Sequence, residues 1–186
     1  GMDKTGYLGR EPIERTIEAL KLFRDVINFD SIKHVLPVAT SAVRDAGNRE
    51  HFLEQTYRET GFQFKVLTGQ EEAFYSYVGA LESICVPTSL FFDLGGGSLE
   101  LVYSENHSIK RIKSYPLGAL RLSQMFGNRG TFSKKDYNKM IDYILDTLPY
   151  KKELSLSIDT TLVGVGGTLR ALARYNQELV GYELDK

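Results

Sequence analysis

Residues 90–103 read Leu-Phe-Phe-Asp-Leu-Gly-Gly-Gly-Ser-Leu-Glu-Leu-Val-Tyr. An apolar run ends in an acidic residue, breaks into three glycines and a serine, and resumes as a second apolar run. Glycines inside a strand cost roughly 0.5–1 kcal/mol each relative to alanine, so a chain that keeps three needs positive φ angles or close approach of its backbone amides to another group. Amides exposed in this way commonly hold a phosphate. A tight hairpin between two core strands explains the glycines equally well.

The composition is that of an ordinary globular protein. At 186 residues, with 42% hydrophobic and 25% charged residues, the chain is long enough for one large domain or two small ones and is not expected to be disordered. A net charge of −1 gives no reason to expect nucleic-acid binding. No apolar run approaches the roughly 20 residues that span a membrane. The single cysteine, Cys85, suits a reducing, cytoplasmic setting.

Strands and helices are expected to alternate along the chain. Helical signals run from Pro12 to Asn28, from Asn48 as a cap to Gly61, through residues 70–81, from Ser133 onwards and through residues 169–173. Apolar runs predict strands at residues 35–39, 62–67, 90–94, 99–103, 109–112 and 161–165, and the polar turn at 105–107 predicts an antiparallel hairpin. This alternation predicts an α/β layered fold. The boundary is expected within the helix near residues 72–77, which divides the chain into lobes 1–74 and 75–186.

Five polar or glycine-rich turns adjoin predicted strands, and ligands gather at strand ends in open α/β sheets. The turns cover residues 40–45, 68–72, 93–100, 116–121 and 164–170. Their candidate groups are a phosphate cradle of Gly95, Gly96, Gly97 and Ser98, the cations Arg44 and Arg121, and the carboxylates Glu71, Glu72, Asp93 and Glu100. Amides and arginines bind phosphate oxygens, whereas carboxylates hold Mg²⁺ or a water, so this set suits a phosphoanhydride substrate.

The same turns carry five recognisable segments in order, from about residue 9 to residue 175. They read Ala-Thr-Ser-Ala-Val-Arg-Asp-Ala (39–46), Thr-Gly-Gln-Glu-Glu-Ala (68–73), Asp-Leu-Gly-Gly-Gly-Ser-Leu-Glu-Leu-Val (93–102), Pro-Leu-Gly-Ala-Leu-Arg-Leu (116–122) and Val-Gly-Val-Gly-Gly-Thr-Leu-Arg-Ala-Leu-Ala (163–173). Together they resemble the exopolyphosphatase and guanosine pentaphosphate phosphohydrolase family of the actin-like ATPase superfamily. The resemblance implies α/β, ribonuclease H-like lobes in which mixed sheets are flanked by helices.

The resemblance also implies roles for the candidate residues. Glu72 matches the family's catalytic glutamate, which orients or deprotonates the attacking water. Arg44 matches an arginine that holds phosphate, and residues 95–98 match the second phosphate loop. Asp93 and Glu100 match acidic residues associated with the metal and the catalytic water, so Mg²⁺ is the expected cofactor.

Side-chain alternation along the second strand leads to a further expectation. Glu100 is expected to face a cleft while Leu99 and Leu101 face the core.

Each candidate also has a structural explanation. Glu72 would be favoured by the helix dipole in a first turn. Arg44 could pair with the neighbouring aspartate or a helix end, Asp93 could cap the glycine turn, and Arg121 is interpreted as a structural helix residue. Residues 166–168 resemble the superfamily's nucleoside-side glycine turn, but a close helix–strand packing turn explains them equally well.

Two features depart from the family pattern. The family begins with an Asp-x-Gly-Ser-Asn turn, the first phosphate loop, and nothing in this sequence matches it, so the first lobe is expected to be incomplete. Leu99 stands where a threonine is common in the second loop. An incomplete lobe exposes sheet edge and apolar surface, which favours a homodimer.

Three functions follow as hypotheses. The first is a hydrolase that releases orthophosphate from polyphosphate or guanosine pentaphosphate by Mg²⁺-assisted attack of water, with Glu72 as general base. The missing first loop instead favours a non-catalytic module that binds phosphate or a nucleotide. A sugar-kinase-like phosphotransferase shares the superfamily turns, but the segment at residues 68–73 argues against it.

Overall fold

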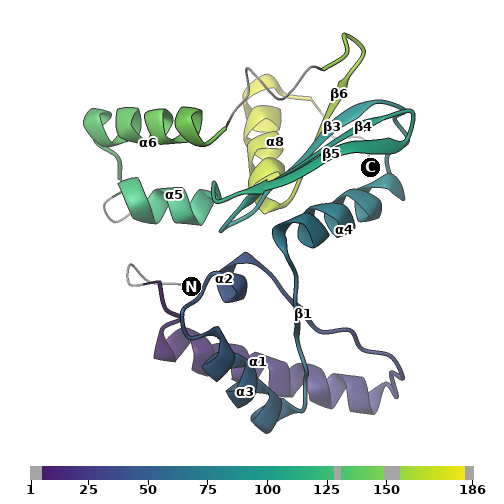
Figure 1. The fold of residues 1–186 in the computed structure, drawn as a ribbon, viewed down its shortest axis with the longest axis vertical. Helices are drawn as coiled ribbons and strands as arrows, with labels where there is room; N and C mark the ends of the chain where they lie inside the picture. Colours follow the sequence, from purple (N-terminus) through teal and green to yellow (C-terminus); the bar gives the residue numbers. More distant parts are fainter. Residues whose placement is uncertain (1–5, 128–130, 149–155, 183–186) are drawn as a thin grey trace. The chain divides into compact units, whose positions relative to one another are not determined.

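Two compact units make up the chain in the computed structural model, which describes residues 6–127, 131–148 and 156–182 (Figure 1). Unit 1 is Gly1–Thr68 and unit 2 is Gly69–Lys186. The sequence placed the boundary after residue 74, inside a helix. In the structure that helix, α4 (Gly69–Leu81), lies wholly within unit 2, because it packs against the sheet of that unit.

The described part of unit 1 combines helices with one small parallel sheet. Its elements are α1 (Arg10–Phe29), β1 (Val38–Ala39), α2 (Ser41–Arg44), α3 (Arg49–Thr60) and β2 (Lys65–Val66). Helices α1 and α3 pack together through Ile13, Ile17 and Phe52. The strands expected at residues 35–39 and 62–67 are present but short, because β1 and β2 pair through two residues each.

The two ends of α3 behave differently from each other. Gly61 has a φ of +77° and its N–H donates to the carbonyl of Tyr57, so a left-handed residue ends the helix as predicted. The prediction that Asn48 caps the helix is wrong, because its side chain makes no cap hydrogen bond. Its Oδ1 instead accepts from the N–H of Leu8 at 2.8 Å, and its Nδ2 donates to the carbonyl of Leu8 at 3.0 Å. Two bonds to a distant segment replace one local cap bond.

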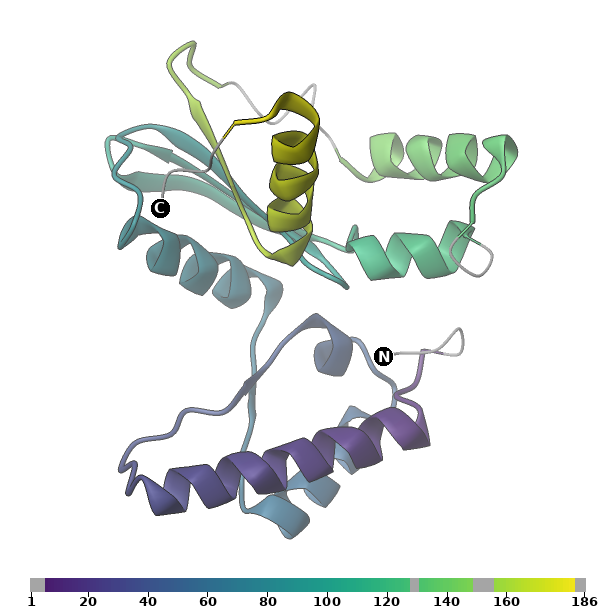
Figure 2. The ribbon, with the colours of Figure 1, turned by 180° about the vertical axis from the view of Figure 1, so that it is seen from behind.

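Unit 2 is built on a four-stranded mixed sheet with the strand order β5-β4-β3-β6. The strands are β3 (Ser89–Leu94), β4 (Leu99–Glu105), β5 (Ser108–Tyr115) and β6 (Thr161–Val165), and the further helices are α5 (Ala119–Phe126), α6 (Lys134–Thr147) and α8 (Gly167–Val180). Strands β3, β4 and β5 are antiparallel neighbours, whereas β6 runs parallel to β3. Helix α4 packs on β3, β4 and β5, and α8 packs on β3 and β6 (Figures 1 and 2). The expected α/β class, a mixed sheet flanked by helices, is confirmed.

Adjacent side chains of β3 show that the two helices cover opposite faces of the sheet. Phe91 is buried against α4 together with Ala73, Tyr77, Val102 and Val163, and its ring contacts the Tyr77 ring edge-on at 5.7 Å. The next side chain, that of Phe92, instead packs beside Gly164 and Leu169 at the start of α8. Successive residues of a strand point to opposite faces, so α4 and α8 lie on different sides.

Local signals at two further positions behave as predicted. Asn106 and His107 have φ angles of 48° and 61°, as a two-residue type I′ hairpin turn requires, and they join β4 to β5. Ser133 caps α6, because its Oγ accepts from the N–H of Asp136 at 3.1 Å and donates to the carboxylate of Asp136 at 2.6 Å. None of the described helices is both long and apolar enough to cross a membrane.

Candidate functional site

The predicted site residues of unit 2 lie around the hairpin between β3 and β4. Asp93, near the end of β3, is directly opposite Glu100, near the start of β4. Directly opposite residues of an antiparallel pair have Cβ atoms about 4.5–5.5 Å apart. Both side chains share the sheet face of Phe91 and Val102, which α4 covers. The hairpin therefore brings two carboxylates together under the first turns of α4.

Helix α4 places Glu72 over this carboxylate pair. Glu72 and Ser76 are four residues apart and lie on the same side of the helix. The Ser76 hydroxyl donates to Oδ2 of Asp93 at 3.0 Å, and the Glu72 charge acts electrostatically on Glu100. At Gly69 an added Cβ would lie 2.5 Å from the Cβ of Ser114 in β5, so only glycine lets the start of α4 approach the sheet this closely.

Glu100 is the most deeply buried of the three carboxylates. It is 1% exposed, and its Oε1 accepts from the Ser114 hydroxyl at 2.8 Å. Burial raises the pKa of the Glu100 carboxyl above its usual range, hydrogen bonds from Ser98 and Ser114 oppose that rise, and the charges of Glu72 and Asp93 add to it. The hydroxyls of Ser98 and Ser114 thus hold this buried carboxylate.

The expectation that Glu100 faces a cleft is wrong. Along β4 the buried positions are Glu100 and Val102, whereas Leu99 and Leu101 are only half-buried. The physical reason is that α4 packs on the face that carries Glu100. That carboxylate therefore points into the interior of unit 2, on the core side of the sheet.

Residues 95–98 form the tight hairpin that the sequence left open as one explanation of the glycines. The N–H of Gly95 donates to the carbonyl of Ser98 at 3.1 Å, and Leu94 pairs with Leu99. None of the three glycines has a positive φ, so the backbone conformation does not require them. Space does not require them at positions 95 and 96 either, because an added Cβ would lie 3.5 Å from the Ser98 carbonyl oxygen and 3.7 Å from the Cβ of Leu120, which are ordinary contacts. The residue that close approach does restrict to glycine is Gly118, where an added Cβ would lie 2.3 Å from the main chain of the loop. Whether the loop also cradles phosphate stays a prediction.

The turn at residues 166–168 also reaches this site. Gly166 has a φ of +94°, and an added Cβ there would lie 2.6 Å from Oδ1 of Asp93. The turn leads directly from β6 into α8, so the helix–strand packing interpretation fits it. The start of α8 consequently lies beside the Asp93 carboxylate, where a helix N-terminus favours negative charge.

Both candidate arginines bond to other residues of the protein. Arg44 belongs to unit 1, where its Nη1 donates to the carbonyl of Leu67 at 3.0 Å and its Nε lies 3.5 Å from Asp45. Pairing with the neighbouring aspartate was the structural alternative for Arg44, and the structure contains that pair; the phosphate contact that the resemblance implies for Arg44 stays a prediction. Arg121, in α5, donates from Nε to the carbonyl of Gly97 at 2.7 Å. This bond joins α5 to the glycine loop.

The carboxylates grouped in the described part of the chain are too few to surround a Mg²⁺ ion, so water and substrate oxygens would have to complete its coordination. Among the residues that the structure describes, no three His, Cys, Asp or Glu side chains are grouped as ligands of one metal ion. Mg²⁺ is commonly held by one or two carboxylates, with water and substrate phosphates completing the octahedron. Asp93, which is half-buried, would supply one such carboxylate, whereas Glu100 is 1% exposed and would add negative charge from the interior.

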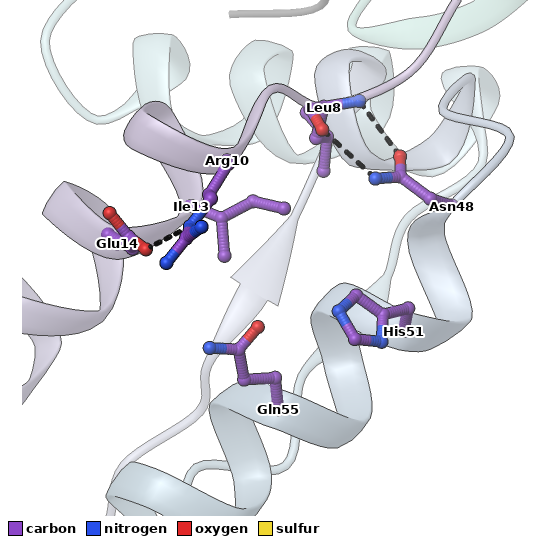
Figure 3. Close-up of a pocket in the computed structure, with 7 residues that line it drawn as sticks. All are labelled: Leu8, Arg10, Ile13, Glu14, Asn48, His51 and Gln55. Carbon is purple, nitrogen blue, oxygen red and sulfur yellow. Dashed lines mark hydrogen bonds and ion pairs between the residues drawn. The ribbon is translucent and has the colours of Figure 1, made fainter.

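A separate open pocket in unit 1 contains none of the predicted site residues. It is lined by Leu8, Arg10, Ile13, Glu14, Asn48, His51 and Gln55 (Figure 3). Arg10 pairs with Glu14 at 2.7 Å, Asn48 bonds the backbone of Leu8, and Gln55 donates to Glu59 at 3.0 Å. Most of its polar groups therefore bond one another, and it is not the candidate site.

Sequence reasoning missed two serines that hold the carboxylates. Ser76 was detectable, because it follows Glu72 by one helical turn and must share its face. Ser114 was not detectable from the sequence, because its pairing with Glu100 depends on an irregularity in the β4–β5 ladder between Tyr103 and Ser104.

Comparisons with known proteins show which proteins this chain is similar to. The sequence model of the Ppx/GppA phosphatase family matches residues 1–185. Exopolyphosphatase 2 of Mycobacterium tuberculosis is 31% identical over 191 residues, which cover 98% of this chain and 60% of that protein. The guanosine-5'-triphosphate,3'-diphosphate pyrophosphatase of Vibrio vulnificus is 30% identical over 175 residues, which cover 92% of this chain and 35% of that protein.

A solved structure extends the comparison to the fold. The crystal structure of an exopolyphosphatase from Cytophaga hutchinsonii matches with a TM-score of 0.86 at 27% identity, covering 100% of this chain and 60% of that chain. The chain thus spans 60% or less of the length of each of these three proteins.

Proposed function

The chain belongs to the Ppx/GppA phosphatase family, and we propose that unit 2 carries a site for hydrolysis of a terminal phosphoryl group of polyphosphate or guanosine pentaphosphate. The observation that supports this most directly is the convergence of Glu72, Asp93 and Glu100 beside the glycine loop within one unit. The names of the mycobacterial and Vibrio relatives support the two substrate classes.

The three carboxylates differ in how accessible they are, and we assign them different roles on that basis. Glu72 is half-buried in the first turn of α4, so it can reach a water molecule, and we assign it the role of general base. A positioned general base contributes about 10²–10⁴-fold to the rate. Glu100 is enclosed by Ser98 and Ser114, so Asp93 would hold Mg²⁺ directly and Glu100 would support it with negative charge from the interior. Mg²⁺ supplies positive charge that neutralises the phosphoryl oxygens.

Phosphate release measured with polyphosphate or guanosine pentaphosphate and Mg²⁺ tests the proposal. Glu72→Gln is expected to lower the rate about 10²–10⁴-fold. Glu71→Gln makes the same change in charge at the adjacent residue, which another helical face carries, and should retain the rate. Equal rates for wild type and Glu72→Gln would reject the role of Glu72.

A binding experiment distinguishes the enzyme from a phosphate-binding module. Inorganic tripolyphosphate should raise the melting temperature of the chain, because a ligand that binds only the folded state stabilises it by RT ln(1 + [L]/Kd). A raised melting temperature with no phosphate release would favour the non-catalytic module. A sugar-kinase-like activity would require an acceptor hydroxyl, and phosphate release without any acceptor argues against it.

A further inference from the structure

Three consecutive carbonyls of the glycine loop are held by the first residues of α5. The N–H of Ala119 donates to the carbonyl of Gly95 at 2.9 Å, and the N–H of Arg121 donates to the carbonyl of Gly96 at 3.0 Å. The side chain of Arg121 completes the series, because its Nε donates to the carbonyl of Gly97 at 2.7 Å. The start of α5 therefore binds one whole side of the loop backbone.

Because these bonds fix the carbonyls of the loop, peptide geometry also fixes the direction of its N–H groups. In a planar trans peptide the carbonyl of one residue and the N–H of the next point in opposite directions. Because the carbonyls of residues 95, 96 and 97 point to α5, the N–H groups of residues 96, 97 and 98 point away from it. Within the described part of the chain, the N–H groups of Gly96 and Gly97 donate to no protein acceptor. Successive backbone N–H groups aimed to one side form a concave site for anions.

We infer that Arg121 and Gly118 are positioning residues that keep the amides of residues 96–98 directed toward a substrate phosphate. This inference rests on the proposed function and adds to it two residues outside the loop that fix the orientation of the loop. The guanidinium of Arg121 donates to a carbonyl at 2.7 Å in fixed planar geometry, which the flexible ammonium of lysine does not reproduce. In this role Arg121 acts through the loop, whereas Glu72 and its neighbours act on the reacting atoms.

The role of Gly118 follows from space alone. Its φ of −72° is open to any residue, so its backbone conformation does not demand glycine. An added Cβ, however, would lie 2.3 Å from the carbonyl oxygen of Gly96 and from the main chain of Gly97. Any side chain at position 118 therefore separates α5 from the loop, without straining its own backbone.

A merely structural role for Arg121 makes a different prediction from a positioning role. If Arg121 only stabilised α5, its loss would lower the melting temperature and leave the affinity of the folded protein for phosphate unchanged. If it orients the loop amides, its loss weakens phosphate binding in protein that is still folded. Arg121→Lys keeps the charge but changes the donor geometry, so it separates orientation from electrostatic attraction.

The test compares Arg121→Ala, Arg121→Lys and Gly118→Ala with Arg174→Ala, which removes one exposed cation from α8 of the same unit. Circular dichroism establishes that each variant is folded. Titration calorimetry with inorganic tripolyphosphate should show about tenfold weaker binding for Arg121→Ala, and a smaller loss for Arg121→Lys, because a hydrogen bond from a charged donor is lost. Arg174→Ala should bind as wild type does.

Hydrogen exchange without ligand supplies an independent readout. The N–H groups of Ala119 and Arg121 donate to the loop, so they should exchange about tenfold faster in Arg121→Ala and Gly118→Ala. Unchanged exchange in both variants, or unchanged tripolyphosphate affinity in a folded Arg121→Ala variant, overturns the inference. Absence of binding by wild type would instead reject the proposed function, while the exchange rates would still decide whether α5 holds the loop.

Discussion

Replacing Ser114 by alanine should destabilise unit 2 by an amount that depends on pH. Ser114 Oγ donates to Oε1 of Glu100 at 2.8 Å, and Glu100 is 1% exposed. Because the Glu100 carboxylate is itself buried, loss of the Ser114 hydroxyl would leave it with one fewer hydrogen-bond donor. Hydrogen bonds to charged groups contribute about 1.5–3 kcal/mol. We expect Ser114→Ala to lower the free energy of unfolding by about that amount at pH 8.

The sign of the pH dependence follows from the environment of Glu100. Burial raises the pKa of its carboxyl in the folded state, and the hydrogen bond from Ser114 opposes this rise. A raised pKa means that the stabilising contribution of the protonated group is fully present below the unfolded-state pKa and is lost as pH rises through the folded-state pKa. Ser114→Ala raises the folded-state pKa further, so the variant should lose more stability than wild type as pH increases.

Urea unfolding followed by far-ultraviolet circular dichroism at pH 4 and pH 8 measures both effects. Ser104→Ala is the matched control, because the Ser104 hydroxyl is fully buried and bonds the neutral Ser89 hydroxyl at 3.0 Å. It should cost about 1 kcal/mol at both pH values. An equal loss for Ser114→Ala at pH 4 and pH 8 would refute the reasoning, and so would a matching pH dependence in Ser104→Ala.

Substitutions at three further positions test individual contacts by the same unfolding measurement. Tyr77→Phe should raise the free energy of unfolding by about 1–3 kcal/mol, because the Tyr77 hydroxyl is buried without a hydrogen-bond partner in the described structure; a loss of stability would show that the hydroxyl has a partner. Asn48→Ala should cost about 1–3 kcal/mol, because both of its bonds to the backbone of Leu8 disappear, and an unchanged midpoint would contradict their importance. Ser133→Ala should cost about 1 kcal/mol through the lost cap of α6, whereas Ser133→Asp, which retains a capping side chain, should cost little; equal losses in both would exclude capping as the cause.

Elements that depend on neighbouring residues were predictable from the sequence. Gly61 ends α3 because only glycine adopts its left-handed conformation without strain, and the turn at Asn106 and His107 joins two strands because both residue types tolerate positive φ. The pairing of Asp93 with the start of β4 follows from the short glycine hairpin, and the helical period places Ser76 beneath Glu72. Each of these features is determined within a few residues of chain.

The environment of Glu100 depends on contacts that no local pattern contains. Alternation shows that Glu100 and Leu101 point to opposite faces, but not which face α4 covers. A regular ladder continued from the turn would also have placed Lys113 opposite Glu100. The register shift between Tyr103 and Ser104 places Ser114 there instead. The local sequence thus determines the glycine hairpin and its acidic neighbours. The burial of Glu100 depends on the packing of α4 against the sheet, and its pairing with Ser114 depends on the one-residue register shift between β4 and β5, so only the tertiary structure decides them.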